Sequence, residues 1–434
     1  MEEPDRNGSA MYQATVCGHD VSTSESRSVS NRLEICAVVL AGVAIVSSAF
    51  HFWPFEDSKA WQLLCPANLA LFLWIAVLVG HVLLQHNRRT ITSLLPHVSV
   101  FAYLGINVLS AAFAPDPGRA LSFTIKLALM FVGGYLLFSA AMSGTKSIRT
   151  VFGVTVAAVT VSVSCCLVTR FAFGSENFGF FDNAYKYGTY TGTLAPLCGT
   201  YLLMSSRGWK RFVGMLLLIG ALISSGSLGA VTAIFVGSVV LLVVVQEWSS
   251  KILVVSCLAC AIGLLILLDS HPATVAIRND AHLADTDGVN LKQRYIEWQA
   301  EINLLEERSI AGTGAGCVNE YRSNFYYRLP KLNTLKAFDQ NGWIATGAET
   351  GIVGLMCFAW VAAHYIRLAY SQVAAGNRPT IHRFAVANFV GLISACTANV
   401  FSSVHYNGVL IVFVLVLALV SRTKNAYRGV ETCE

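Results

Sequence analysis

The residues best suited to chemistry lie in one long polar interval, from Asp269 to Asn341, between two apolar stretches. Its second part is basic and aromatic. Guanidinium groups bind phosphate bidentately and aromatic faces stack on sugar rings, so this pattern suits a ligand that is anionic at one end and sugar-like at the other. An interfacial aromatic belt over lipid headgroups is the simpler alternative. The residues concerned are Arg308, Arg322, Arg328, Lys331, Lys336, Tyr321, Phe325, Tyr326 and Tyr327.

The first part of the interval is acidic and predicts an amphipathic helix. Leu291, Tyr295, Trp298, Ile302 and Leu305 recur at spacings of four and three, which is typical of an apolar helical stripe. We expect this stripe to lie on the membrane surface or to cap a helix bundle. A second stripe of the same helix carries Arg294, Glu297 and Glu301.

A glycine-rich turn, Gly312-Thr313-Gly314-Ala315-Gly316, separates the two parts. Successive glycines can turn several backbone N–H groups inward to form an anion nest. The segment lacks the Lys-Ser/Thr pair of a nucleotide-binding P-loop. A plain loop turn is the alternative interpretation.

The elements that must position these residues are membrane helices. The chain has 434 residues, of which 55% are hydrophobic and only 13% charged. The apolar residues form blocks long enough to cross a bilayer, and we predict an all-α polytopic membrane protein with about 12 transmembrane helices. The predicted spans are Leu33–Trp53, Ala60–Leu84, Thr92–Phe113, Ala120–Ala141, Val151–Phe173, Gly188–Ser205, Phe212–Ser225, Gly229–Gln246, Ile252–Leu268, Trp343–Leu368, Phe384–Phe401 and Tyr406–Val420.

Lys and Arg in the short loops predict the orientation, because these residues resist translocation. They gather in loops on one side, at Arg88, Arg89, Lys146, Arg149, Arg207, Lys210, Arg211, Lys251, Arg367, Arg378 and Arg383. Both termini are therefore predicted to be cytoplasmic, and the large loop between helices 9 and 10 extracytoplasmic. The predicted organisation is a disordered tail (1–32), helices 1–9 (33–268), the loop (269–342), helices 10–12 (343–421) and a second tail (422–434). This bias explains the net charge of +5 without nucleic acid.

The cysteines indicate neither a metal site nor a disulfide framework. Cys257 and Cys260 form a C-x-x-C, but it lies inside an apolar span with no nearby histidine. Cys317 is the only cysteine of the outer loop. We expect no metal and no cofactor.

Several motifs together resemble the O-antigen ligase and O-antigen polymerase superfamily. The core of the resemblance is Arg294 to Trp298, Gly312 to Gly316, Asn341-Gly-Trp343 and Glu349-Thr-Gly351-Ile-Val-Gly354. Ser110 to Leu121 and Phe180-Phe-Asp-Asn183 give further support. The resemblance covers roughly 98–420 and rests on the order and spacing of the motifs.

The resemblance implies glycan transfer outside the cytoplasmic membrane of a bacterium. The implied donor is a polyprenyl-diphosphate-linked oligosaccharide. The implied acceptor is another lipid-linked repeat for a polymerase, or a lipid A core sugar for a ligase. A polysaccharide flippase and a chain-length regulator are implied partners. The leaving diphosphate must be held by fixed cations, while a base or acceptor orients the incoming hydroxyl.

The resemblance also implies the site residues. Arg294, Asp339 and Gln340 are the catalytic candidates, with Arg294 binding diphosphate and Asp339 acting as base. An ion pair with Glu297 or Glu301 is the alternative for Arg294, and a solvated or helix-capping carboxylate is the alternative for Asp339. The substrate-binding candidates are Arg119, Lys186, Arg322, Arg328, Gly314, Asn341 and Glu349. Glu349 is alternatively protonated and hydrogen-bonded between helices.

Two departures from the family pattern bear on the activity. The family's His-Asn pair reads Gln340-Asn341, and its Ser-Arg-Gly-Ala reads Ser227-Leu228-Gly229-Ala230. We favour a polymerase, because polymerases vary more at these positions. An O-antigen ligase, a non-catalytic glycan-lipid-binding relative and a transporter stay open as alternatives, although a transporter would need a polar pathway of which Lys126, Glu349 and His364 are the few candidates.

Overall fold

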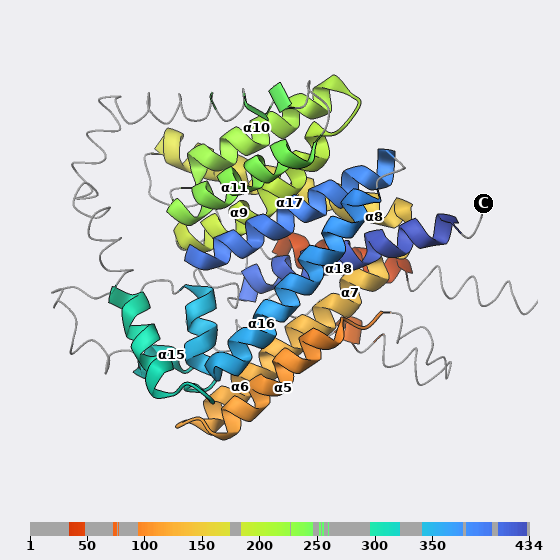
Figure 1. Ribbon diagram of the computed structural model, residues 1–434. Coiled ribbons are helices and arrows are strands. Elements are labelled where there is room, and N and C mark those ends of the chain that lie inside the picture. The colour runs from red at the N-terminus through yellow and green to blue at the C-terminus, as the bar shows by residue number, and fades with distance from the viewer. Residues whose placement is uncertain are drawn as a thin grey trace, which may run out of the picture.

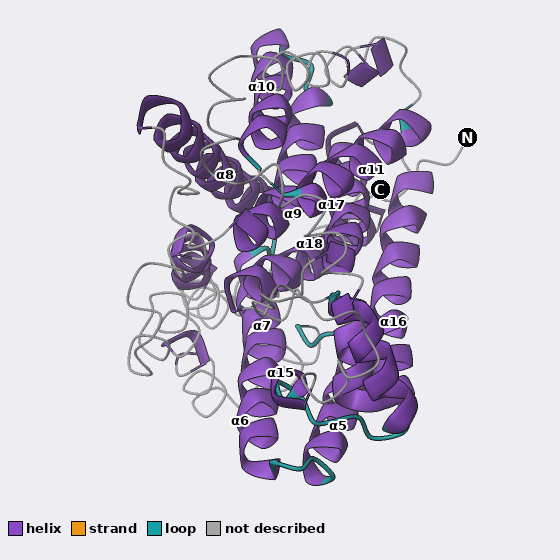
Figure 2. Cartoon of the chain, turned by 90° about the vertical axis from the view of Figure 1, so that its left-hand side faces the viewer, coloured by secondary structure: helices purple, strands orange, loops and turns teal. Residues whose placement is uncertain are grey.

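The computed structural model of the protein describes residues 34–47, 73–75, 77, 94–173, 184–225, 227–245, 251–252, 254–255, 259, 296–321, 341–375, 379–401 and 407–431. Within these residues every regular element is a helix (Figures 1 and 2). The predicted all-α class is confirmed. Side chains are described for most of these residues, and the helices pack into one bundle (Figure 1).

The helices follow the apolar blocks and begin and end at residues that suit helix ends. Asp116 caps α6 by accepting a hydrogen bond from the N–H of Arg119, and Pro117 occupies the first turn. A π-helical turn, η1, joins α6 to α7 without interrupting the rod. The elements are α5 (Val98–Ala112), α6 (Pro117–Ala128), η1 (Leu129–Gly133), α7 (Gly134–Ala141), α8 (Thr145–Phe173), α9 (Ala184–Leu203), α10 (Gly208–Ser224), α11 (Leu228–Val244), α15 (Val318–Tyr321), α16 (Gly342–Ala374), α17 (Pro379–Phe401) and α18 (Asn407–Glu431).

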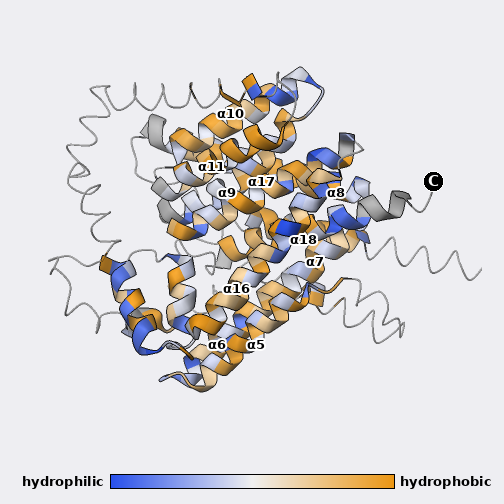
Figure 3. Ribbon diagram, in the orientation of Figure 1, coloured by the Kyte–Doolittle hydropathy of each residue, from blue (hydrophilic) through white to orange (hydrophobic). Residues whose placement is uncertain are grey.

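The length and apolar character of these helices indicate a membrane protein. Four helical stretches are long and apolar enough to cross a bilayer: Pro117–Ala141, Thr145–Thr169, Gly342–Ala374 and Ile381–Phe401. Hydrophobic residues follow the bundle, whereas hydrophilic residues gather at helix ends and beside α15 (Figure 3). Shorter apolar helices are Glu34–Ser47, Val98–Ala112 and Gly229–Val244.

The helix bounds agree with many of the predicted spans, including the division between the predicted spans Phe212–Ser225 and Gly229–Gln246. α10 ends at Ser224 and α11 begins at Leu228, so two helices flank Gly226 as the sequence predicts. The predicted spans Ala60–Leu84 and Ile252–Leu268 fall largely outside the described residues. The number of about 12 spans and the placement of the loop therefore stay predictions. α18 runs beyond the predicted end of its span at Val420, as far as Glu431.

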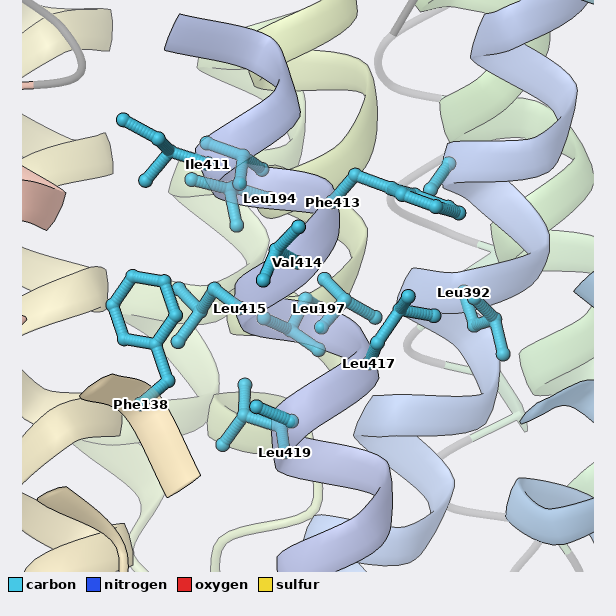
Figure 4. Packing of buried hydrophobic residues seen from close by; sticks show 14 of the residues in the cluster. Phe138, Leu194, Leu197, Leu392, Ile411, Phe413, Val414, Leu415, Leu417 and Leu419 are labelled. Atoms are coloured by element: carbon cyan, nitrogen blue, oxygen red, sulfur yellow. The ribbon is translucent and has the colours of Figure 1, made fainter. Parts of the chain in front are cut away.

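α18 lies at the centre of the bundle. From Val409 to Val420 no residue is more than 2% exposed, and a helix that is apolar on all sides is expected in such a position. Its side chains meet Phe138 of α7, Leu194 and Leu197 of α9, and Leu392 of α17 (Figure 4). α9 is likewise buried from Lys186 to Thr200, and it packs against α10, α11 and α17.

α16 is not one straight span. At Gly351 the backbone leaves the helical region, with φ 72° and ψ −179°. A short helix, 342–350, precedes this break, and Figure 1 shows it beside α15, running in a different direction from the long remainder of α16. The Trp343 ring lies 4.9 Å from that of Phe358, although fifteen residues of straight helix would separate them by about 22 Å. We call 342–350 the folded-back half-helix.

Candidate functional site

The break in α16 is closed by hydrogen bonds to another part of the chain. In a regular helix the N–H of Ile352 would bond to the carbonyl of Ala348. Here it donates to the carbonyl of Ser309, at 2.8 Å. A Cβ on Gly351 would collide with the carbonyl of Ile310, and its positive φ also favours glycine. The break therefore requires glycine and a partner segment that begins at Ser309.

That partner segment is the glycine-rich turn. The N–H groups of Thr313 and Gly314 donate to the two carbonyls beside the break, those of Ala348 and Glu349, at 3.0 and 2.8 Å. The N–H of Gly312 donates to the carbonyl of Arg308 at 3.0 Å. These N–H groups are thus used within the protein. Their geometry supports the plain-turn interpretation of the glycine segment over an anion nest.

The turn between α5 and α6 completes this arrangement, which we call the α16 junction (residues 309–317, 348–352 and 110–120). The Ser110 hydroxyl lies 2.6 Å from the carbonyl of Ala311 and 2.8 Å from that of Glu349, and it donates to one of them at a time. A Cβ on Gly314 would collide with Ala114 and Ala120. The loop, the broken helix and the α5–α6 turn therefore pack without a gap between them.

Arg119 and Cys317 lie next to each other at this junction. Arg119 is exposed at the start of α6, while Cys317 is fully buried among Ala111, Ala114 and Ala120. Burial raises the pKa of the Cys317 thiol, and the nearby Arg119 charge opposes the increase. Arg119 is therefore an exposed cationic residue at the edge of the junction.

Glu349 lies at the corner between the folded-back half-helix and the rest of α16. Its side chain is only 9% exposed, and its carboxylate accepts a hydrogen bond from the N–H of Gly316. The predicted span Trp343–Leu368 is broken at Gly351, two residues after Glu349. Glu349 therefore lies near the end of the first helical segment, about two turns from its start at Gly342.

Asn341 caps the folded-back half-helix. Its Oδ1 accepts hydrogen bonds from the N–H groups of Trp343 and Ile344, at 3.0 and 3.2 Å. The N-cap of this helix is therefore Asn341, and the capping role considered for Asp339 is filled by another residue. The buried Asn341 side chain uses its oxygen for this purpose.

The helix predicted in the acidic half is present over residues 296–307. Trp298, Ile302 and Leu305 of its apolar stripe are partly buried, and the position of this stripe on the membrane surface or over the bundle stays a prediction. The fully buried face carries Glu297, Ala300, Glu301 and Leu304. This face points inward because the helix packs through Ala300 and Leu304 on Ala348 of the half-helix.

A series of close contacts connects this helix with the outer ends of α17, α11 and α9. Trp298 and Phe401 have ring centroids 6.4 Å apart. A Cβ on Gly229 would collide with Phe401, and one on Gly188 with Ser227. Lys186 begins the buried part of α9 two residues earlier and is 8% exposed. A cationic side chain of α9 and two acidic side chains of the 296–307 helix therefore belong to helices that meet at the same end of the bundle.

Several predicted site residues lie outside the described residues: Arg294, Asp339, Gln340, Arg322 and Arg328. Of the others, the structure brings Arg119, Gly314 and Glu349 together at the α16 junction. Asn341 lies at the opposite end of the half-helix from Glu349. Lys186 is on α9.

Sequence reasoning missed Ser110, Gly351 and the inward direction of Glu297 and Glu301 as features of the site. The Glu297–Glu301 pair offered a signal, since the two acids are four residues apart on one helical face with Ala300 and Leu304 beside them. Gly351 and Gly354 sit three residues apart in an apolar run, a spacing that alone does not separate a break from close packing.

These helices and the outer junction define a polytopic membrane protein whose polar residues gather at one end of the bundle. The model of a family described as O-antigen ligase matches residues 213–359. The matched stretch includes α10, α11, the 296–307 helix, the glycine-rich turn and the break in α16. Over this stretch the chain is similar to the O-antigen ligase and O-antigen polymerase superfamily. No curated protein matches the chain significantly.

The similarity of this stretch to the family supports a membrane function in the handling of lipid-linked glycans. The match covers the part of the chain in which the sequence motifs of the outer loop lie. It bears equally on polymerases and ligases. In the described residues no group of three or more His, Cys, Asp or Glu is placed to hold a metal ion.

Proposed function

We propose that the protein polymerises polyprenyl-diphosphate-linked oligosaccharides at the outer face of the bacterial inner membrane, with both termini cytoplasmic. The observation that carries this proposal is the inward-facing stripe of the 296–307 helix. Glu297 and Glu301 are fully buried there, and Arg294 precedes them by three and seven residues, on the same helical face. We propose that Arg294 shares the stripe of these two carboxylates.

The leaving group explains the need for fixed cations. Breaking the anomeric C–O bond releases a polyprenyl diphosphate, whose growing charge is best stabilised by groups already in place. Arg294 is the proposed main contact, because a guanidinium forms two parallel bonds with phosphate oxygens. The arginine of the family's Ser-Arg-Gly-Ala motif is replaced by Leu228 in this chain. We propose that the missing positive charge is supplied by Arg119, Lys186, Arg322 and Arg328.

The acceptor hydroxyl must lose its proton as it attacks the anomeric carbon. We assign this proton to Asp339, with Gln340 orienting the hydroxyl by a hydrogen bond. Both residues directly precede Asn341, the cap of the half-helix. The carboxylate would then lie close to the start of a packed helix, which supports a defined position. Gly314 and Glu349, bonded within the junction, support the site rather than contact the substrate.

A ligase that transfers the glycan to a lipid A core sugar is the second candidate. The matching family is described as O-antigen ligase, and the match does not distinguish a ligase from a polymerase. Gln340 at the position of the family's histidine argues against it, because an amide cannot accept a full proton at neutral pH. A flippase and a chain-length regulator are proposed partners of either activity.

The test is the length profile of the surface glycan with and without the gene in its native host. We expect the long chains to disappear while a single repeat stays attached. Loss of all attached glycan would instead establish the ligase. An unchanged profile would overturn both activities and favour a transporter or a non-catalytic relative.

A further inference from the structure

Glu349 takes part in the α16 junction through two different groups. Its main-chain carbonyl accepts from the N–H of Gly314 at 2.8 Å, and its carboxylate accepts from the N–H of Gly316. The Ser110 hydroxyl lies 2.8 Å from the same carbonyl. One residue thus binds the middle and the end of the glycine-rich turn and the end of α5.

The junction determines where the folded-back half-helix points. Residues 342–350 are attached to the rest of α16 only through the non-helical Gly351, so their direction depends on what holds the corner. At the far end, the Trp343 indole N–H donates to the carbonyl of Cys396 at 3.2 Å, and a Cβ on Gly342 would collide with Asn399. A small rotation at the corner would therefore move Gly342 and Trp343 out of these contacts with α17, and Asn341 with them.

We propose that Glu349 is a positioning residue, which locks the glycine-rich turn onto the break in α16 and so sets the direction of the half-helix that carries Asn341 at its start. The proposal rests on the proposed function for its effect on glycan, because Asp339 and Gln340 directly precede Asn341. The lock itself is a property of the folded protein. It requires a hydrogen-bond acceptor at residue 349, and a negative charge is not needed.

This requirement separates a positioning role from direct contact with the substrate. Glutamine has nearly the same shape and keeps a carbonyl oxygen that accepts the Gly316 N–H. Alanine removes the acceptor and leaves the N–H of the half-buried Gly316 without that partner, which is costly. Glu349→Gln should therefore preserve the lock, whereas Glu349→Ala should open it.

Cys317 reports the lock directly, because it is fully buried one residue beyond Gly316. Purified protein in detergent is treated with a maleimide, and the peptide that contains Cys317 is followed by mass spectrometry. We expect Glu349→Ala to raise the labelling rate roughly tenfold, the shift in local opening that loss of a buried hydrogen bond produces. Glu349→Gln should label like the unchanged protein. Met356→Ala, an exposed position further along α16, serves as the matched control, and Cys317→Ser verifies the labelled peptide.

The glycan profile of the same variants completes the test. We expect Glu349→Ala to lose the long chains and Glu349→Gln to recover most of them. Lost chains in Glu349→Gln with Cys317 still protected would show that the carboxylate acts directly, and would overturn the proposal. A Cys317 that stays protected from labelling in Glu349→Ala would also overturn the proposal. The same holds if Cys317 becomes reactive in Glu349→Ala while the glycan profile is unchanged. If deletion of the gene leaves the glycan unchanged, the proposed function fails, and labelling alone then decides whether the lock exists.

Discussion

Burial of Glu297 and Glu301 moves two carboxyl groups away from water, which is costly unless cations or hydrogen-bond donors compensate them. Sequence periodicity predicted the helix that carries them and the stripe that they share with Arg294. It could not predict which stripe faces inward, because apolar residues next to lipid are as favourable as apolar residues inside a bundle. In a membrane protein the buried face can therefore be the polar one.

At the scale of the residue, Arg294 is the most direct test of the catalytic assignment. We expect Arg294→Ala to reduce long-chain glycan roughly 100-fold, the cost of removing one preorganised charge-stabilising group. Arg294→Lys should not restore it, because an ammonium group lacks the bidentate fork. Glycan profiles and protein level are measured together, with Arg207→Ala, an exposed arginine at the start of α10, as control. Near-normal polymer in Arg294→Ala would remove this residue from the mechanism.

Asp339 and Gln340 can be distinguished by comparing two substitutions. If Asp339 is the base, Asp339→Asn should slow polymerisation about 100-fold, the usual contribution of general base catalysis. Gln340→Ala should have a smaller effect, because it removes only an orienting hydrogen bond. The rates are compared in membranes that contain equal amounts of each variant. Equal, mild losses would exclude Asp339 as the base.

At the scale of the element, the folded-back half-helix is what the sequence did not reveal. The segment from Trp343 to Leu368 is predicted as one apolar span, because hydropathy depends on composition and does not show where a helix changes direction. The break depends on hydrogen bonds from Thr313 and Gly314, more than thirty residues earlier in the chain. The division between α10 and α11, in contrast, was predictable from the local Gly226-Ser227 pair.

Gly351→Ala tests the break. The left-handed φ costs a non-glycine residue about 1–2 kcal/mol, and the new Cβ would also collide with the carbonyl of Ile310. We therefore expect a clear decrease in the thermal unfolding midpoint of the purified protein. The control is Gly105→Ala in α5, where a Cβ would meet no atom within 4 Å. A helical Ala in place of Gly contributes roughly 0.5–1 kcal/mol of stability, so this midpoint should stay or rise. Equal midpoints for the two variants would refute the break.

At the scale of the whole molecule, the proposed function requires the junction to lie outside the cytoplasm. Cys317 is too deeply buried to report this. Ile310, in the same loop, is 78% exposed. We expect Ile310→Cys to react with a membrane-impermeant maleimide added to intact cells with a permeabilised outer membrane, and the unchanged protein to react far less. Reaction of Ile310→Cys only after lysis would place the loop in the cytoplasm and exclude the proposed function.

The buried position of α18 has a consequence for biogenesis. The ribosome delivers this helix after α5 to α17, so the helices that will surround it first enter the bilayer without it. Hydrocarbon chains must occupy the space between them and then leave when α18 arrives. Assembly therefore ends with an exchange of lipid for protein, and cellular quality control can distinguish finished from unfinished copies by whether that exchange has occurred.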